Sequence, residues 1–256
     1  MARRDDDTDV TREPHLNQAH GFTPDPTEPG EDDRPLPASD EALDEHLARH
    51  GVWDEPGLSP ALSGAPPEQA VTYARWYQKQ KQRTSLFKSW AIMTLLALLA
   101  GPAAVLGAFA GMQTGGWRVA AIVVIAPVTE ELLKAVLPMY TTETRPYLIR
   151  SGWQILLCGL AGGLAFATIE NLIYLNIYIP DPSASLALWR WTVCSAMHTV
   201  CAGIAAIGVW QIWRVVDATG QMPDLKRALP ALAVAIVIHG GYNAFALMLS
   251  LSDYNF

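Results

Sequence analysis

The sequence contains little cysteine and, after residue 88, little charge. Its three cysteines, Cys158, Cys194 and Cys201, all fall in apolar runs and none belongs to a CxxC pair. This spacing argues against a disulfide framework and a thiolate zinc site, and we expect small apolar packing residues instead. No apolar segment follows the start "MARRDDDTDV", so the sequence does not predict an N-terminal signal peptide.

Charge is distributed unevenly along the 256 residues. Residues 1–70 hold 17 acidic and 5 basic side chains, whereas residues 71–256 hold 8 acidic and 13 basic ones. The first segment is also rich in proline and poor in aliphatic residues, so it cannot bury enough apolar surface to offset the entropy of ordering. We therefore predict a disordered, acidic, cytoplasmic tail over residues 1–70. Within it, "SDEALDEHLARHG" is a marginal helix, and we favour a fluctuating turn over a docking motif.

A basic and aromatic segment, residues 71–89, follows the tail. Tyrosine and tryptophan settle at the level of lipid headgroups, and lysine and arginine favour the anionic cytoplasmic leaflet. The same residue types occur in nucleic-acid-binding proteins, but an apolar run begins immediately afterwards. We therefore predict a juxtamembrane segment and a lipid partner, with no nucleic acid.

Five long apolar runs occupy the remaining chain, at residues 90–112, 117–139, 152–179, 187–213 and 229–252. Each is long enough to cross a hydrocarbon core of roughly 30 Å. The sequence thus predicts an all-α membrane protein, a bundle of about five transmembrane helices. With the N-terminus inside, ten lysines and arginines fall on the cytoplasmic side and only Arg118 and Arg190 on the outer side. This bias predicts a cytoplasmic N-terminus and an extracytoplasmic C-terminus in the cell membrane.

Polar side chains interrupt four of these runs near their midpoints. In chain order they are Glu130, Glu131, Lys134, Glu170, His198, His239 and Asn243. At 1.5 Å per residue, all of them fall within roughly 7 Å of the bilayer midplane. Each charge at that depth costs about 2.5–3.5 kcal/mol, so the groups must pair, bind a metal or line a wet cavity. Because so many converge on one depth, we favour a functional site over a polar network that only fixes helix register.

This set of residues is suited to hydrolysis. A carboxylate can act as a general base toward water, histidine and glutamate are ordinary zinc ligands, and Asn243 can donate to a developing oxyanion. Lys134 follows Glu130 by four residues, so the two side chains share a helix face and are predicted to pair. The pairing would leave Glu131 as the base.

Four motifs in four successive runs resemble the PrsW family of intramembrane proteases, which is similar to the wider CAAX-processing group. They are "EELLK", "FATIEN", a histidine within a span, and "HGGYN". The resemblance implies a protease domain over residues 90–252, classed as a metalloprotease, that cleaves a membrane-anchored protein such as an anti-sigma factor. By position it assigns motif residues to Glu130, Glu131, Glu170, His198 and His239.

Two site chemistries remain open at this point. In the first, His198, His239 and Glu170 bind a divalent metal, zinc, with water in the fourth position. In the second, no metal is needed, and His239 and Asn243 form the oxyanion site. The CAAX-type relatives carry histidine where this chain has Glu170, so their metal-free mechanism does not transfer directly. In both schemes we predict that Lys134 and Asn171 support the site residues.

Two other function classes compete with the protease. A proton- or cation-coupled transporter can also use midplane glutamate and histidine, but five spans without an inverted repeat suit alternating access poorly. A catalytically inactive scaffold could instead recruit a partner through the acidic tail. Because the tail places no group at the midplane, we expect it to be dispensable for the chemistry.

Overall fold

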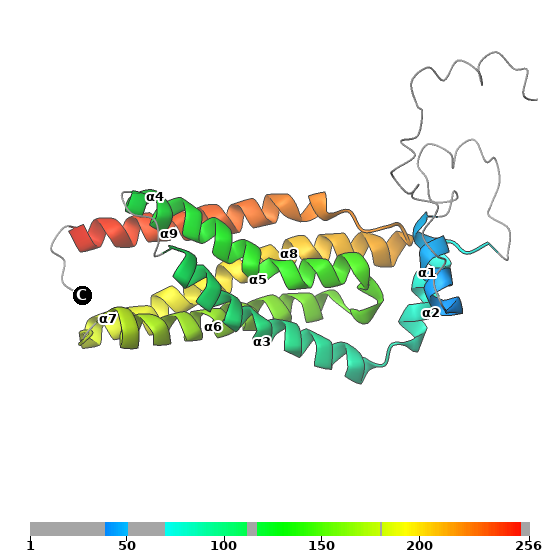
Figure 1. The fold of residues 1–256 in the computed structure, drawn as a ribbon, viewed down its shortest axis with the longest axis horizontal. Coiled ribbons are helices and arrows are strands. Elements are labelled where there is room, and N and C mark those ends of the chain that lie inside the picture. Colours follow the sequence, from blue (N-terminus) through cyan, green and yellow to red (C-terminus); the bar gives the residue numbers. More distant parts are fainter. Residues whose placement is uncertain (1–38, 51–69, 112–116, 180, 252–256) are drawn as a thin grey trace, which may run out of the picture. The chain divides into compact units, whose positions relative to one another are not determined.

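The computed structural model describes residues 39–50, 70–111, 117–179 and 181–251. Every regular element within these ranges is a helix, which confirms the all-α prediction (Figure 1). The chain divides into two units, Met1–Leu43 and Asp44–Phe256, and the following description concerns the second. Residues 1–38 and 51–69 of the predicted tail lie beyond the described part of the chain.

The helices fall into five continuous stretches and two shorter pieces. The five are α3 (Leu86–Gly111), α4–η5–α5 (Arg118–Ala120, Ala121–Ile125, Ala126–Thr144), α6–η7 (Gly152–Ile173, Tyr174–Tyr178), α7–η8–α8 (Ala184–Trp189, Arg190–Cys194, Ser195–Thr219) and η9–α9 (Leu225–Ala228, Leu229–Leu251). The shorter pieces are α1 (Asp40–His50) and α2 (Tyr73–Arg83), and the 3-10 turn η6 (Pro146–Leu148) links α5 to α6. The segments η5, η7 and η8 are π-helical, a geometry often found at functional sites.

Three of these stretches are long and apolar enough to cross a membrane: Gly152–Tyr178, Ala184–Thr219 and Leu225–Leu249. A fourth is added if α2 and α3, which meet at a bend of 97°, are counted as one span. Among the described residues, length and apolarity therefore support three to four spans rather than the five predicted. The missing one is Arg118–Thr144, whose two glutamates and lysine lower its hydropathy although its helix is continuous.

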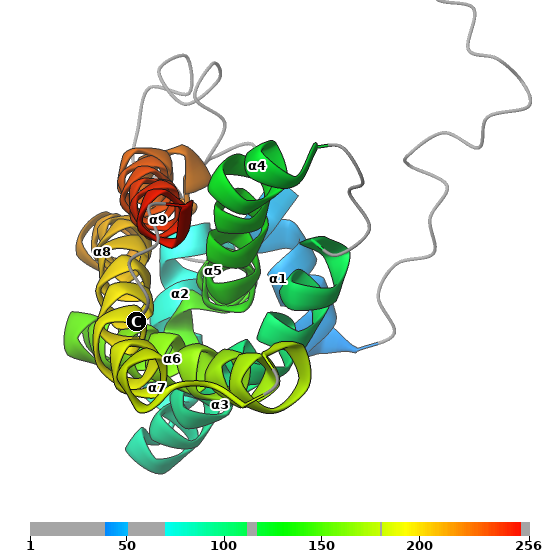
Figure 2. The same cartoon turned by 90° about the vertical axis from the view of Figure 1, so that its left-hand side faces the viewer.

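The helix α6 packs against α3 on one side and α8 on the other, and α9 packs against α8 (Figures 1 and 2). Glycines allow the close approach of α6 to α8. A Cβ atom at Gly163 would lie 2.7 Å from the backbone oxygen of His198, and one at Gly159 would lie 2.4 Å from the Cβ of Ala206. These small faces agree with the packing expected for membrane helices, and they fix His198 relative to α6.

The helix α2 lies across one end of the bundle. Thr72 caps its N-terminus, and three of its own aromatic side chains, Tyr73, Trp76 and Tyr77, are buried. The Tyr77 hydroxyl donates to Asp217 of α8 at 2.7 Å. Burial, followed by this hydrogen bond, raises the pKa of Tyr77 above its ordinary value. This amphipathic helix is thus anchored to α8 by both apolar and polar contacts.

From Asp44 onward, α1 packs on α2. Ala48 is fully buried in a cluster with Tyr73, Trp76 and Tyr77, and Asp44 pairs with Lys79 at 2.6 Å. The guanidinium of Arg49 lies 5.3 Å from the Trp76 ring centre and also donates to the backbone oxygen of Thr144. The expectation of a fluctuating turn is therefore wrong for this part of the tail, because aromatic side chains of α2 provide a surface that stabilises a short helix.

Candidate active site

Three ionisable side chains enter the bundle from α5. Glu130, Glu131 and Lys134 are all buried, and Glu131 is fully so. The ammonium of Lys134 donates to Oε1 of Glu131 at 2.5 Å. The predicted pairing of Lys134 with Glu130 is therefore wrong: the lysine bonds to the residue three positions before it. Both spacings are possible on a helix, and here the lysine turns toward α8, where its Nζ lies 3.2 Å from Nδ1 of His198.

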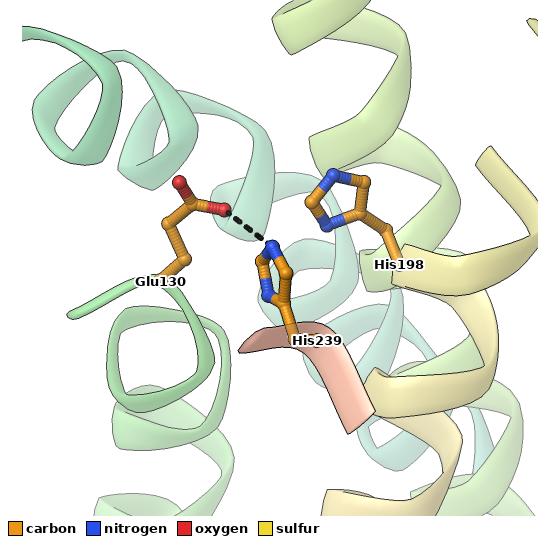
Figure 3. Close-up of side chains that lie close together, drawn as sticks. All are labelled: Glu130, His198 and His239. Carbon is orange, nitrogen blue, oxygen red and sulfur yellow. Dashed lines mark ion pairs between the residues drawn. The ribbon is translucent and has the colours of Figure 1, made fainter. Parts of the chain in front are cut away.

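His239 of α9 lies between the two glutamates of α5. Its Nδ1 is 2.7 Å from Oε1 of Glu131, and its Nε2 is 3.7 Å from Oε2 of Glu130. Figure 3 shows the Glu130 carboxylate directed at the His239 ring, with His198 beside them. The neighbouring Gly240 permits this approach, because a Cβ atom there would lie 2.6 Å from the backbone oxygen of Val123 in η5.

His198 of α8 completes the centre from the opposite side. Its Nε2 lies 2.8 Å from Oε2 of Glu170 on α6. The rings of His198 and His239 meet edge to face with centroids 4.8 Å apart, and Phe166 packs 5.1 Å from the His198 ring. The site therefore collects side chains from α5, α6, α8 and α9, as the common depth of these residues in the sequence predicted.

Two carboxylate oxygens in this centre lack a hydrogen-bond partner among the described residues. They are Oε2 of Glu130 and Oε2 of Glu131, and both are buried. Leaving a buried polar atom unpaired costs about 1–3 kcal/mol, and more for a charged group. Such atoms are typical of a site that is completed by a cation, a water molecule or a substrate.

The donor atoms form two groups suited to a metal ion. In one, Glu130, His198 and His239 each offer an atom within 4.8 Å of the others; in the other, Glu170, Cys194 and His198 do so. The predicted ligand set of His198, His239 and Glu170 is thus divided between the two groups. Glu170 bonds instead to one nitrogen of His198, the position of a residue that orients a ligand.

The PrsW family of intramembrane metalloproteases matches residues 85–254, which is most of the chain. The chain belongs to this family. It is therefore a multi-pass membrane protein and an intramembrane protease that acts on a protein substrate in a lipid environment. No curated protein and no solved structure matches it.

Membership confirms the resemblance drawn from the motifs, and the side-chain amides of the two motif asparagines donate to groups other than these carboxylates. The Asn243 amide donates to the backbone oxygen of Ile122 at 2.9 Å, joining α9 to the π turn η5. The Asn171 amide donates to the backbone oxygen of Arg190 at 3.0 Å and to Oγ of Ser195 at 3.1 Å. Both asparagines therefore connect helical segments next to the buried glutamates and histidines.

Sequence reasoning missed two side chains at the site, Arg190 and Cys194. Arg190 was predicted to lie in the outer loop, yet its Nη2 lies 3.3 Å from Oε2 of Glu170. The thiol of Cys194 lies 3.9 Å from the same oxygen. A signal was present, because Arg190, Cys194 and His198 follow one another at intervals of four and so share a helix face.

Proposed function

We propose that this protease hydrolyses a peptide bond of a membrane-anchored protein at the centre formed by Glu130, His198 and His239. An anti-sigma factor is the substrate class that the family resemblance suggests. The proposal rests on one observation: three buried donor groups from three helices lie within 4.8 Å of one another, and one of their oxygens has no hydrogen-bond partner in the described structure.

The donor set fits zinc. Two histidines and one carboxylate leave a fourth position for water, the pattern of catalytic zinc sites. The ring nitrogen of each histidine that would not bind the metal contacts a carboxylate: Nδ1 of His239 lies 2.7 Å from Glu131, and Nε2 of His198 lies 2.8 Å from Glu170. Carboxylates occupy these positions when they orient zinc ligands. Zinc held there would supply Lewis acidity, activating a water molecule and polarising the scissile carbonyl.

The protein groups around this centre can carry the protons of the reaction. Hydrolysis adds the water oxygen to the carbonyl carbon, breaks the C–N bond and transfers a proton to the departing nitrogen. Oε2 of Glu131 has no hydrogen-bond partner among the described residues, so it can accept the proton of the water. Lys134 and His239 hold the other oxygen of this carboxylate and keep it in place.

One contact favours a second mechanism without metal. Nε2 of His198 faces Glu170, so a metal bound by Glu130 and His239 would have to use Nδ1 of His198. Nζ of Lys134 lies 3.2 Å from that Nδ1 and competes with a metal for it. In the metal-free scheme Glu130 is the base, since its Oε2 faces the centre without a hydrogen-bond partner in the described residues. His239 then stabilises the oxyanion. The Asn243 amide, which uses one of its two N–H groups on the Ile122 carbonyl, is a second candidate donor.

Metal content and cleavage together test the proposal. We expect purified protein to contain close to one zinc per chain, and His198→Ala and His239→Ala to lose it.

Membrane proteomes of cells carrying the wild type or Glu130→Gln should differ by one membrane-anchored protein that accumulates uncleaved. Glu143→Gln, near the end of the same helix, is the matched control. Active protein that is free of metal in a strong chelator would establish the second mechanism, and the absence of any stabilised substrate would overturn the function.

A further inference from the structure

Arg190 is a cation held inside the bundle, next to the active site. It begins the π-helical segment η8, and its side chain is only 13% exposed. Its Nη2 lies 3.3 Å from Oε2 of Glu170, and its guanidinium carbon lies 3.9 Å from the centre of the Tyr174 ring. A charged group at such a position is costly unless it serves a site, so its role requires an explanation.

Both the side chain and the backbone of Arg190 are hydrogen-bonded to Asn171 of α6. The Nε of Arg190 donates to the Asn171 side-chain oxygen at 3.1 Å, and the Asn171 amide donates back to the Arg190 backbone oxygen at 3.0 Å. The guanidinium is therefore prevented from extending toward the headgroups, as a long basic side chain near a helix end otherwise does. Nη2 makes no hydrogen bond among the described residues, so its contact with Glu170 is an ion pair that the Asn171 bond keeps in place.

The contacts continue from Arg190 to the catalytic centre. Oε2 of Glu170 lies between the guanidinium and Nε2 of His198. We propose that Arg190 is a positioning residue that holds the Glu170 carboxylate against His198, so that His198 presents its other nitrogen to Glu130 and His239. This rests on the proposed function, because it assigns His198 to the catalytic centre.

The test uses full-length protein in lipid nanodiscs, with cleavage of a substrate identified by the proteomic comparison and zinc affinity as readouts. Loss of a group that orients a metal ligand, here Glu170, typically lowers activity or metal affinity about 10–100-fold, and we expect Arg190→Gln to lower both by up to this amount because it acts through Glu170. Arg190→Lys keeps the charge but loses the Nε bond to Asn171, so it should recover only part of both. Arg118→Gln removes an exposed cation from the other predicted outer position and should change neither.

A double-mutant cycle separates positioning from simple support of the fold. If Arg190 acts through Glu170, Arg190→Gln should change cleavage less than about twofold in a Glu170→Gln background, because coupled residues are not additive. The double variant also removes both buried charges, so it should accumulate even if Arg190→Gln alone does not. Additive losses, or Arg190→Gln protein as active as Arg118→Gln protein, would overturn the proposal. Wild-type protein that cleaves nothing would overturn the proposed function instead.

Discussion

At the scale of single residues, the two adjacent glutamates have different surroundings and should respond differently to the same substitution. Oε1 of Glu131 bonds to Lys134 and His239, whereas Oε2 of Glu130 has no hydrogen-bond partner among the described residues. Removing one member of a buried ion pair costs about 3–5 kcal/mol, since the remaining charge stays uncompensated. Glu131→Gln should therefore lower thermal stability and membrane accumulation, whereas Glu130→Gln should abolish cleavage and leave both nearly unchanged.

The cause of the Glu131 effect can be checked with a second substitution. Adding Lys134→Met to Glu131→Gln removes the lone cation, so accumulation should return while cleavage stays absent. Thermal unfolding and immunoblots of membranes measure the first effect, and a substrate assay measures the second. Equal stability of the two single variants would show that the Lys134–Glu131 ion pair contributes little to folding.

Much of the site could be predicted from the sequence, but its pairings could not. Periodicity and span length place Glu130, Glu170, His198 and His239 at one depth without any structure. They do not determine whether Lys134 bonds three or four residues back, because both partners lie within reach on a helix. Arg190 was missed for a related reason: the predicted fourth run began near it, whereas the helix begins at Ala184 and carries it into the bundle.

At the scale of helices, the contact between α6 and α8 fixes the position of His198. A Cβ atom at Gly163 would lie 2.7 Å from the backbone oxygen of His198 and 2.8 Å from Cα of Thr199. Because backbone atoms cannot turn aside as a side chain can, Gly163→Ala must push the helices apart. We expect a loss of about 1–3 kcal/mol in stability, as for other overpacked cores, together with slower cleavage.

Gly241 provides the matched control for this substitution. It lies in α9, two residues after His239, and a Cβ atom there would meet nothing within 4 Å. Gly241→Ala should leave stability unchanged or raise it by up to about 1 kcal/mol, because alanine is the better helix former. Thermal unfolding in nanodiscs measures both variants, and an equal response of the two would show that the α6–α8 contact can adapt.

At the scale of the whole molecule, the orientation in the membrane remains a prediction. The basic residues Lys81 and Arg150 lie at one end of the bundle, where Arg150 donates to the Lys81 backbone oxygen at 2.6 Å. A cytoplasmic N-terminus and an odd number of spans place the C-terminus outside. A reporter fused after Phe256 should therefore behave as extracytoplasmic. A cytoplasmic reporter would indicate an even number of spans, with Arg118–Thr144 the first stretch to question because of its charges.

The N-terminal segment should contribute to stability rather than to chemistry. Ala48 is fully buried against α2, and Arg49 donates to the backbone oxygen of Thr144 at the end of α5, but the buried glutamates, lysine and histidines of the candidate site all lie at or after Glu130. A chain beginning at residue 71 should lose about 1.5–3 kcal/mol for the charged hydrogen bond alone, and still cleave its substrate.

A chain beginning at residue 39 is the control for this truncation. It keeps α1 and the Arg49 contacts described above, so its unfolding temperature should equal that of the full chain. Arg49→Ala in the full chain should reproduce part of the loss seen for the chain beginning at residue 71, because it removes the bond to Thr144 while leaving Ala48 packed. If either truncated chain reached normal membrane levels but cleaved nothing, the segment it lacks would act in substrate recruitment, and the acidic residues before Val71 would be the first to test by charge reversal.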